Sequence, residues 1–285
     1  MKFESEENAQ LYALKATSKH TTENDLLKRI EDYKRYQDAY ANDQEKKQYW
    51  HERAKATKSY LNSEYYKSGR YHIGIDELIL DIIEIRAIIF SFQTVKTNCN
   101  PFETYMFHSQ WLSGCTYKIF ASYGKLLSRH KNDHSLKNVW NNVSHYIKDS
   151  SLTSIEEVDK LSSFINGINN NTSNPMRYRN KVIAHNEQLP KVQWTDLDYE
   201  LKGLCRIWSL ITMWCSTGII APFYDNKTAF SGLESVVSSL ELSELKNARQ
   251  EYIDNVRRWC KASITTNISD NNNSPFAEIS FGFNV

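Results

Sequence analysis

Apolar residues recur along this chain at the three-to-four-residue spacing of amphipathic helices. The clearest case is 75–97, IDELILDIIEIRAIIFSFQTVKT, where isoleucines and leucine form a wide apolar stripe. Glu77, Asp81 and Glu84 take the opposite side. We predict that this segment is a core helix of a bundle.

Weaker stripes, bounded by helix-capping residues, predict the other helices. Asn100 with Pro101, Thr153 with Glu156, and Asn174 with Pro175 match helix starts, and Thr195 or Asp196 can cap a further helix. The predicted helices are about 101–131, about 135–149, 153–168, one that starts at Pro175, one that ends near Pro222, and about 232–262.

The segment 22–67 is strongly charged and also has a helical pattern. Thr22 can cap it, and an apolar stripe runs to Tyr40, breaks at NDQEKK (42–47) and resumes at Trp50. This pattern fits one long helical arm or a helical hairpin. It either lies on the main body as a solvated helix or binds a partner as a coiled coil.

Composition supports an all-α fold, a helical bundle with added helices at each end. Gly (9) and Pro (5) are scarce in 285 residues, so few turns are needed. Hydrophobic residues make up 40% and aromatic residues 13%, enough for a real core. We divide the chain into a charged extension (1–70), a central bundle (75–225), and a C-terminal helix with an irregular tail (230–285).

Charge and cysteine content narrow the classes of function. With 35 Lys+Arg against 34 Asp+Glu, no global field would draw the protein to nucleic acid, so polyanion binding must be local. The five cysteines form no C-x-x-C pair, which indicates thiols in a reducing cytoplasm. The N-terminus MKFESEENAQ does not resemble a signal peptide.

One uncharged run, IWSLITMWCSTGIIAPFY (207–224), tests whether the protein enters a membrane. Its 18 residues are marginal for a membrane span, and several are Ser, Thr, Gly or Pro. We expect a buried bundle helix and no membrane contact.

The main candidate site is PMRYRNKVIAHNE (175–187), which follows the asparagine-rich loop NNNTSN (169–174). Arg177 and Arg179 fall in the first turns of the predicted helix, where free N–H groups and the positive dipole end lie. Cations are mildly unfavourable there unless an anion such as phosphate joins them.

On an ideal helix, Arg179 and His185 point about 120° apart, so one chain has no compact acid–base pair. Tyr178, Val182 and His185 would share one stripe. Two copies related by a twofold axis could make a cleft that holds two imidazoles and at least two guanidinium groups.

That set of groups suits RNA cleavage without a metal. Histidine can act as base for the 2′-OH or as acid for the departing 5′-oxygen, and arginine stabilises the charged phosphorane. Asn180 can orient an imidazole or a phosphate. In the plainer alternative, His185 is a core residue and the arginines are solvated or paired with an acid such as Glu187.

The segment RNKVIAH (179–185) resembles the signature of the HEPN superfamily: an arginine, then a polar residue, then a histidine four to six residues after the arginine. The flanking YRNKVIAHNE is most similar to the abortive-infection HEPN proteins of bacteria. These families fold as bundles of roughly four or five helices, with the motif at the start of a late helix.

The resemblance implies an endoribonuclease that needs no metal or other cofactor and acts as a homodimer in phage defence or as a toxin. By residue, it implies that Arg179 and His185 are catalytic and that Asn180 assists them. Arg177, Tyr178 and Lys181 lie outside the signature, so we expect them only as substrate contacts. The expected partners are RNA, a second copy of the chain, and an antitoxin or other defence-system protein.

Two other patterns carry weaker expectations. His130 and His134 have the spacing of a metal-binding pair, but no further ligands accompany them, so we expect no metal site. Residues 101–150 are locally basic, which fits an RNA flank or an ordinary solvated face. The rival function is a non-catalytic helical scaffold, with 22–67 as its partner-binding element.

Overall fold

The structure is a computed structural model that describes residues 3–17, 23–68, 74–97, 106–150, 152–185, 191–215 and 229–264. Every regular element in these ranges is a helix, which confirms the predicted all-α class for them. The first helices are α1 (Glu6–Thr17), α2 (Glu23–Ala39), α3 (Gln44–Leu61) and the short α4 (Glu64–Lys67). They are followed by α5 (Ile75–Thr94), α6 (Met106–Leu126), α7 (Leu136–Asp149), α8 (Ile155–Gly167), α9 (Asn174–Tyr178), the π-helix η1 (Arg179–Ala184), α10 (Trp194–Trp214) and α12 (Ser239–Lys261).

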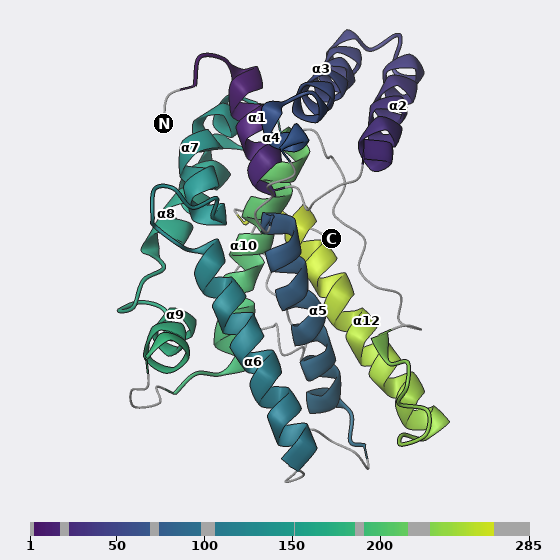
Figure 1. Ribbon diagram of the computed structural model, residues 1–285, viewed down its shortest axis with the longest axis vertical. Coiled ribbons are helices and arrows are strands. Elements are labelled where there is room, and N and C mark those ends of the chain that lie inside the picture. Colours follow the sequence, from purple (N-terminus) through teal and green to yellow (C-terminus); the bar gives the residue numbers. More distant parts are fainter. Residues whose placement is uncertain are drawn as a thin grey trace.

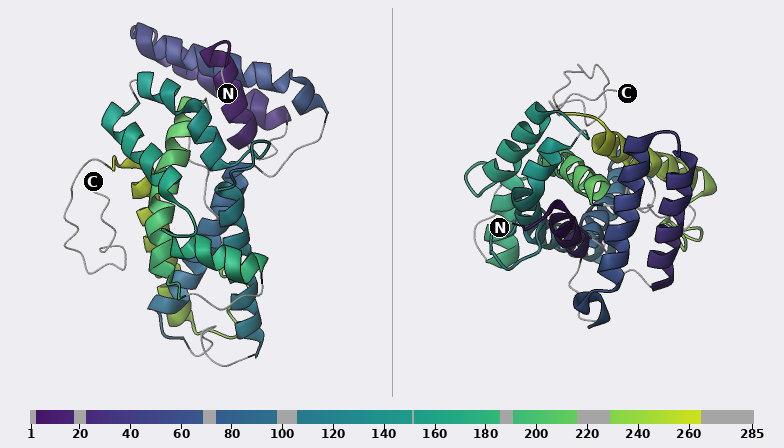
Figure 2. Two further views of the ribbon diagram at one scale, coloured as in Figure 1. Left: turned by 90° about the vertical axis from the view of Figure 1, so that its left-hand side faces the viewer. Right: turned by 90° about the horizontal axis from the view of Figure 1, so that it is seen from above.

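Four long helices form the body of the molecule (Figure 1). Helix α5 packs against α6 and α12, and α10 packs against α12 and α7. Helices α2 and α3 lie across one end of this bundle (Figure 2, left). Helix α9 lies on the outside of the bundle, beside α6 (Figure 1).

The predicted stripe of α5 forms part of the main core. Ile75, Ile79, Ile82, Ile83 and Ile89 are fully buried. Four tryptophans, from α7, α10 and α12, fill the space between the helices and are each at most 1% exposed: Trp140, Trp208, Trp214 and Trp259. Burial of such large apolar side chains is the main stabilising contribution to a bundle of this kind.

Helix α1 was not predicted, yet it belongs to the same core. Ala9, Ala13 and Leu14 are buried in the main apolar cluster, and α1 packs against α3, α7 and α10. Trp214 Nε1 also donates a hydrogen bond to Glu6 Oε1 at 2.9 Å. The core therefore extends across the predicted boundary at residue 70, because small alanine side chains let α1 approach its neighbours closely.

The charged segment 22–67 forms a helical hairpin and not one long arm. Helices α2 and α3 pack on each other, with the Tyr33 and Tyr36 rings 5.6 and 4.8 Å from Trp50. Asp43 caps α3 by accepting a hydrogen bond from the Lys46 amide. The break predicted at 42–47 is thus the start of the second hairpin helix.

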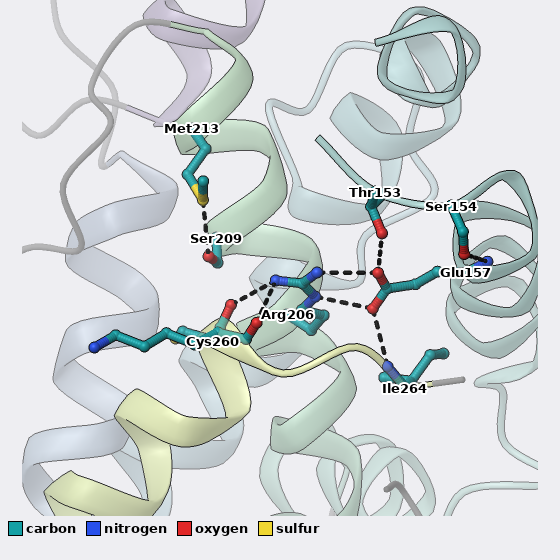
Figure 3. A network of polar contacts seen from close by, with 9 residues as sticks. Thr153, Ser154, Glu157, Arg206, Ser209, Met213, Cys260 and Ile264 are labelled. Carbon is teal, nitrogen blue, oxygen red and sulfur yellow. Dashed lines mark hydrogen bonds and ion pairs between the residues drawn. The ribbon is translucent and has the colours of Figure 1, made fainter. Parts of the chain in front are cut away.

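A buried ion pair joins α8, α10 and the end of α12 (Figure 3). Arg206 Nε and Nη2 donate to the Glu157 carboxylate at 2.9 and 3.0 Å, and Nη1 donates to the Cys260 carbonyl at 2.9 Å. Burial opposes ionisation of Glu157, but hydrogen bonds from Arg206, Thr153 and the Ile264 amide hold its pKa below the usual value. This buried, charge-assisted pair therefore links α8, α10 and α12.

Several predicted helix caps are one or two residues away from the observed ones. Ser154, and not Thr153, caps α8, while Thr153 donates to the Glu157 carboxylate. Gln193 caps α10, with Asp196 completing a capping box. Adjacent polar residues can each serve as caps, and tertiary contacts decide between them. The predicted helix end near Pro222 is wrong, because α10 ends at Trp214 and Cys215 is its C-cap. The predicted caps Thr22 and Asn100 and the tail 265–285 lie outside the described residues.

Candidate active site

The helix that carries the predicted motif begins one residue earlier than expected. Ser173, and not Asn174, is the N-cap of α9, and its side chain accepts from the Met176 amide at 2.9 Å. Pro175 occupies the first turn, where its missing N–H costs nothing. Ser173 also donates to Glu200 Oε2 at 3.0 Å, so the start of α9 is tied to α10.

Glu200 is a buried carboxyl group behind this helix start. Tyr123 of α6 donates to the same oxygen that Ser173 contacts. Burial raises the pKa of Glu200 to about 8. A carboxyl group that is neutral at pH 7 can therefore hold α6, α9 and α10 together without a buried negative charge.

The predicted α-helix does not continue through the motif. After the five residues of α9 the chain forms the π-helix η1, and His185 follows it in an extended conformation (φ −135°, ψ 149°). Tyr178 and Ile183, five residues apart, both pack against the main core. In a π-helix, hydrogen bonds join residues that are five apart in the sequence. This kind of helix is rare overall, and where it does occur it is often at a functional site. The predicted stripe of Tyr178, Val182 and His185 is therefore wrong.

Arg177 is held by the loop that precedes α9. Its Nε donates to the Asn170 carbonyl at 3.1 Å, and its Nη2 donates to the Asn171 carbonyl at 3.2 Å. The guanidinium group thus binds backbone oxygens that the loop cannot satisfy by itself. This geometry favours a structural role for Arg177 over the predicted substrate contact.

Tyr178 is also engaged in packing. Its ring lies 4.6 Å from that of Phe120 on α6, and burial raises the pKa of its hydroxyl. Tyr178 therefore anchors the motif to the bundle, and Lys181 lies on the exposed side of η1.

Arg179 and Asn180 form the fixed part of the site. Arg179 Nη1 donates to Asn180 Oδ1 at 2.7 Å, and the Asn180 amide donates to the Asn170 side-chain oxygen. The Asn170 side chain thus holds the Asn180 amide group, and the neutral oxygen of Asn180 orients the guanidinium group of Arg179.

These residues border a pocket between α6 and the loop before α9. Its volume is about 440 Å³. It is lined by Gly124, Lys125, Leu127, Ser128, Arg129, Asp133, Ile168, Asn169, Asn170, Met176, Arg179 and Asn180. Three of these side chains are cationic and one is acidic, so the pocket suits an anion.

His185 lies at the end of η1, and its side chain is exposed. It is not among the residues that line the pocket. One chain therefore presents Arg179 in η1 and His185 just after its end, but does not enclose them in one cavity. The predicted alternative of a buried core histidine is wrong, and Glu187 lies outside the described residues.

The described residues contain no group of three or more His, Cys, Asp or Glu side chains arranged to hold a metal ion. His130 instead lies 3.6 Å from Asp133, and the His134 ring lies 6.1 Å from that of Tyr12. Four cysteines, Cys115, Cys205, Cys215 and Cys260, are free thiols. Cys99 lies outside the described residues.

Within the described ranges, the helices all fall short of the length and apolar character that crossing a membrane would require. Helix α10, which holds the first part of the uncharged run, is packed in the bundle and buries Arg206 and Asp198.

The chain matches no protein-family model, no curated protein and no solved structure.

Proposed function

We propose that this protein is a metal-independent endoribonuclease that acts as a homodimer, in phage defence or as a toxin. The observation that carries the proposal is that Arg179 and Asn180 border a cation-lined pocket while His185 is exposed at the end of the same π-helix. Metal independence follows from the resemblance of RNKVIAH to the HEPN signature and from the chemistry of its residues.

In this reaction the 2′-oxygen of a ribose attacks the adjacent phosphorus, and the bond from phosphorus to the 5′-oxygen breaks. The imidazole of one His185 takes the 2′-OH proton, and that of the second copy gives a proton to the departing 5′-oxygen. Arg179 donates hydrogen bonds to the phosphorane, whose negative charge is greatest in the transition state. The products are a 2′,3′-cyclic phosphate and a free 5′-OH.

Each chain supplies one imidazole, so the scheme requires a second copy. The exposure of His185 supports this requirement, because a solvent-facing imidazole is available to a site shared by two protomers. The fixed orientation of Arg179 supports it too, because a preorganised donor needs no rearrangement during the reaction.

The test is cleavage of single-stranded RNA by the purified full-length protein in the presence of EDTA. We expect 2′,3′-cyclic phosphate ends and a rate that falls by a factor of about 10²–10⁴ in Arg179→Ala and His185→Ala. His145→Ala, which removes an exposed histidine on α7, is the matched control and should keep the wild-type rate. Products with 3′-OH ends would contradict the proposal and point to a different cleavage reaction. Equal rates in all variants would show that Arg179 and His185 are not catalytic, and no cleavage by the wild type would favour a non-catalytic scaffold.

A mixing experiment tests the shared site. Wild-type protomers are unfolded and refolded, or co-expressed, with a varying excess of protomers that carry His185→Ala. A mixed dimer keeps only one of the two imidazoles that the shared site needs, so activity should fall with about the square of the wild-type fraction. If each protomer has its own complete site, activity will fall in proportion to the wild-type fraction.

A further inference from the structure

Gly124 of α6 has no side chain, and this leaves the space that the Arg179 side chain occupies beside the pocket. A Cβ atom at Gly124 would lie 2.3 Å from Arg179 Nε, which is closer than real Cβ contacts come, and 3.0 Å from Cδ, which is tighter than most of them. The Arg179 side chain therefore lies directly against the backbone of α6. Gly114 on the same helix is different, because a Cβ there would meet nothing within 4 Å.

Lys125 and Arg129 extend this cationic surface along the same side of the pocket. They are four residues apart, one at the end of α6 and one just beyond it, and both line the pocket. Arg129 Nη2 donates to the Ile168 carbonyl at 3.2 Å, which fixes the guanidinium group at the rim. The pocket is thus lined by Lys125 and Arg129 from α6 and the residues just after it, and by Arg179 from η1.

One other cation of α6 is already paired with an acid. Lys118, two turns before Lys125 on α6, lies 3.0 Å from Asp81. Within the described ranges, no carboxylate forms an ion pair with Lys125, Arg129 or Arg179. The acid at the pocket, Asp133, accepts a hydrogen bond from Ser128 and lies 3.6 Å from His130.

The size of the pocket indicates what kind of anion it takes. A volume of about 440 Å³ lies in the range of sites that hold small molecules and cofactors, and exceeds what a bare ion needs. Asn169 and Asn170 add neutral polar groups beside the three cations. A phosphate with its attached nucleoside matches this combination of charge, polarity and size.

We propose that this pocket binds an RNA nucleotide whose phosphate neighbours the one that is cleaved. Lys125 and Arg129 hold the neighbouring phosphate, and Arg179, placed by Gly124, lies between it and the reacting phosphate. His185 lies outside the pocket, so the reacting phosphate sits on the η1 side of Arg179. The identity of the ligand as RNA rests on the proposed function.

The first test measures binding without cleavage. A fluorescent single-stranded RNA with 2′-O-methyl riboses lacks the attacking hydroxyl, so its anisotropy reports binding by the full-length protein alone. We expect the double variant Lys125→Gln/Arg129→Gln to bind about tenfold more weakly at moderate salt. The slope of log affinity against log salt should become shallower by about 0.7, since the two side chains hold one phosphate and each neutralised phosphate of a single strand contributes about 0.7. Lys118→Gln is the matched control and should bind like the wild type.

The outcomes separate this inference from the proposed function. If RNA is cleaved but the double variant binds with wild-type affinity and slope, the pocket inference is wrong and the nuclease proposal stands. If binding depends on Lys125 and Arg129 but no RNA is cleaved, the nuclease proposal fails and the pocket remains an oligonucleotide site. Displacement of the RNA by low-millimolar inorganic phosphate would show a site for free anions and overturn the inference.

The second test concerns Gly124. Gly124→Ala should leave the melting temperature unchanged or raise it, because alanine favours helix and the Arg179 side chain can move aside. The same variant should cleave RNA at least tenfold more slowly, while Gly114→Ala should be stabilised to a similar degree and cleave normally. Normal cleavage and binding by Gly124→Ala would show that Gly124 does not position Arg179.

Discussion

Arginines of this protein occur in two contrasting environments, the bundle core and the pocket beside α9. In the core, Arg206 faces Glu157 at 2.9 Å and Arg86 faces Asp198 at 2.6 Å, with every one of these side chains at most 8% exposed. At the pocket, Arg179 donates to the side-chain oxygen of Asn180, and Arg129 donates to the Ile168 carbonyl. Arg206 and Arg86 thus have charged partners, whereas Arg179 and Arg129 have neutral ones.

The difference follows from the cost of burying charge. A guanidinium group sealed inside a bundle must be neutralised by a carboxylate, since an unpaired buried charge is strongly destabilising. A guanidinium group open to solvent needs no such partner. Neutral oxygens can hold it in one orientation without cancelling its field, so its charge remains available to an anionic ligand.

The largest expected effect is on the core pair. Arg206→Ala leaves the Glu157 carboxylate buried without its charged partner, so the free energy of unfolding should fall by about 3–5 kcal/mol. Urea denaturation measures this change. Arg257→Ala, which removes an exposed partner of Asp254 on α12, is the matched control and should cost less than about 1 kcal/mol. Equal losses in the two variants would mean that burial does not distinguish the pairs.

The next effect depends on pH and concerns Glu200, which joins the core to the site. Its pKa is about 8 in the folded protein against an ordinary value of 4.5. Between these values the unfolded chain loses the proton and the folded one keeps it. The free energy of unfolding should therefore decrease as pH rises from about 4.5 to about 8, by at most about 1.4 kcal/mol per pH unit.

Glu200→Gln removes this dependence and keeps an oxygen that can accept from Tyr123 and Ser173. Relative to the wild type, the variant should be least stable near pH 5 and gain stability toward pH 8. Asp76, whose pKa burial raises to about 7, adds a similar slope to both proteins, so their difference isolates Glu200. A difference that stays constant from pH 5 to pH 8 would show that Glu200 does not titrate in this range.

The smallest effects compare the two arginines of the motif. Arg177→Ala removes two hydrogen bonds to loop carbonyls and should cost about 1–2 kcal/mol of stability, with faster hydrogen exchange in residues 169–173. Arg179→Ala should change stability by less than about 0.5 kcal/mol, because its hydrogen bond goes only to the side chain of the adjacent Asn180. The reverse order of the two losses would make Arg179 the structural residue.

Core helices were predictable because burial leaves a strong pattern in the sequence. The stripe of α5 marks its buried side, and the break at 42–47 marks the turn of the α2–α3 hairpin. Helix α1 was not predicted because its buried side is made of alanines, Gln10 and Thr17 beside a single leucine, Leu14, which leaves only a weak apolar pattern.

The candidate site was predictable only in part. The sequence pattern indicated that Arg179, Asn180 and His185 lie on a helix after an asparagine-rich loop. Arg179 and Asn180 do, but His185 follows the end of η1 in an extended conformation. Assuming ideal helical geometry placed His185 on the Tyr178 stripe, and the π-helix moves it off that stripe. The resemblance singled out Arg179, but nothing in the sequence indicated that Arg177 binds the preceding loop. The contacts of the two arginines depend on Asn170, Asn171 and Gly124, which packing brings to them.

By itself, the sequence determined the all-α class and the inventory of cations, amides and histidine in residues 175–187. The spacing of apolar residues and the presence of capping residues are local properties, because each depends only on residues within one or two helical turns. Only the tertiary structure decided which cations are neutralised and which face the pocket. The glycine, lysine and arginine of the α6 region are about fifty residues away from Arg179 along the chain, and packing alone brings them to it.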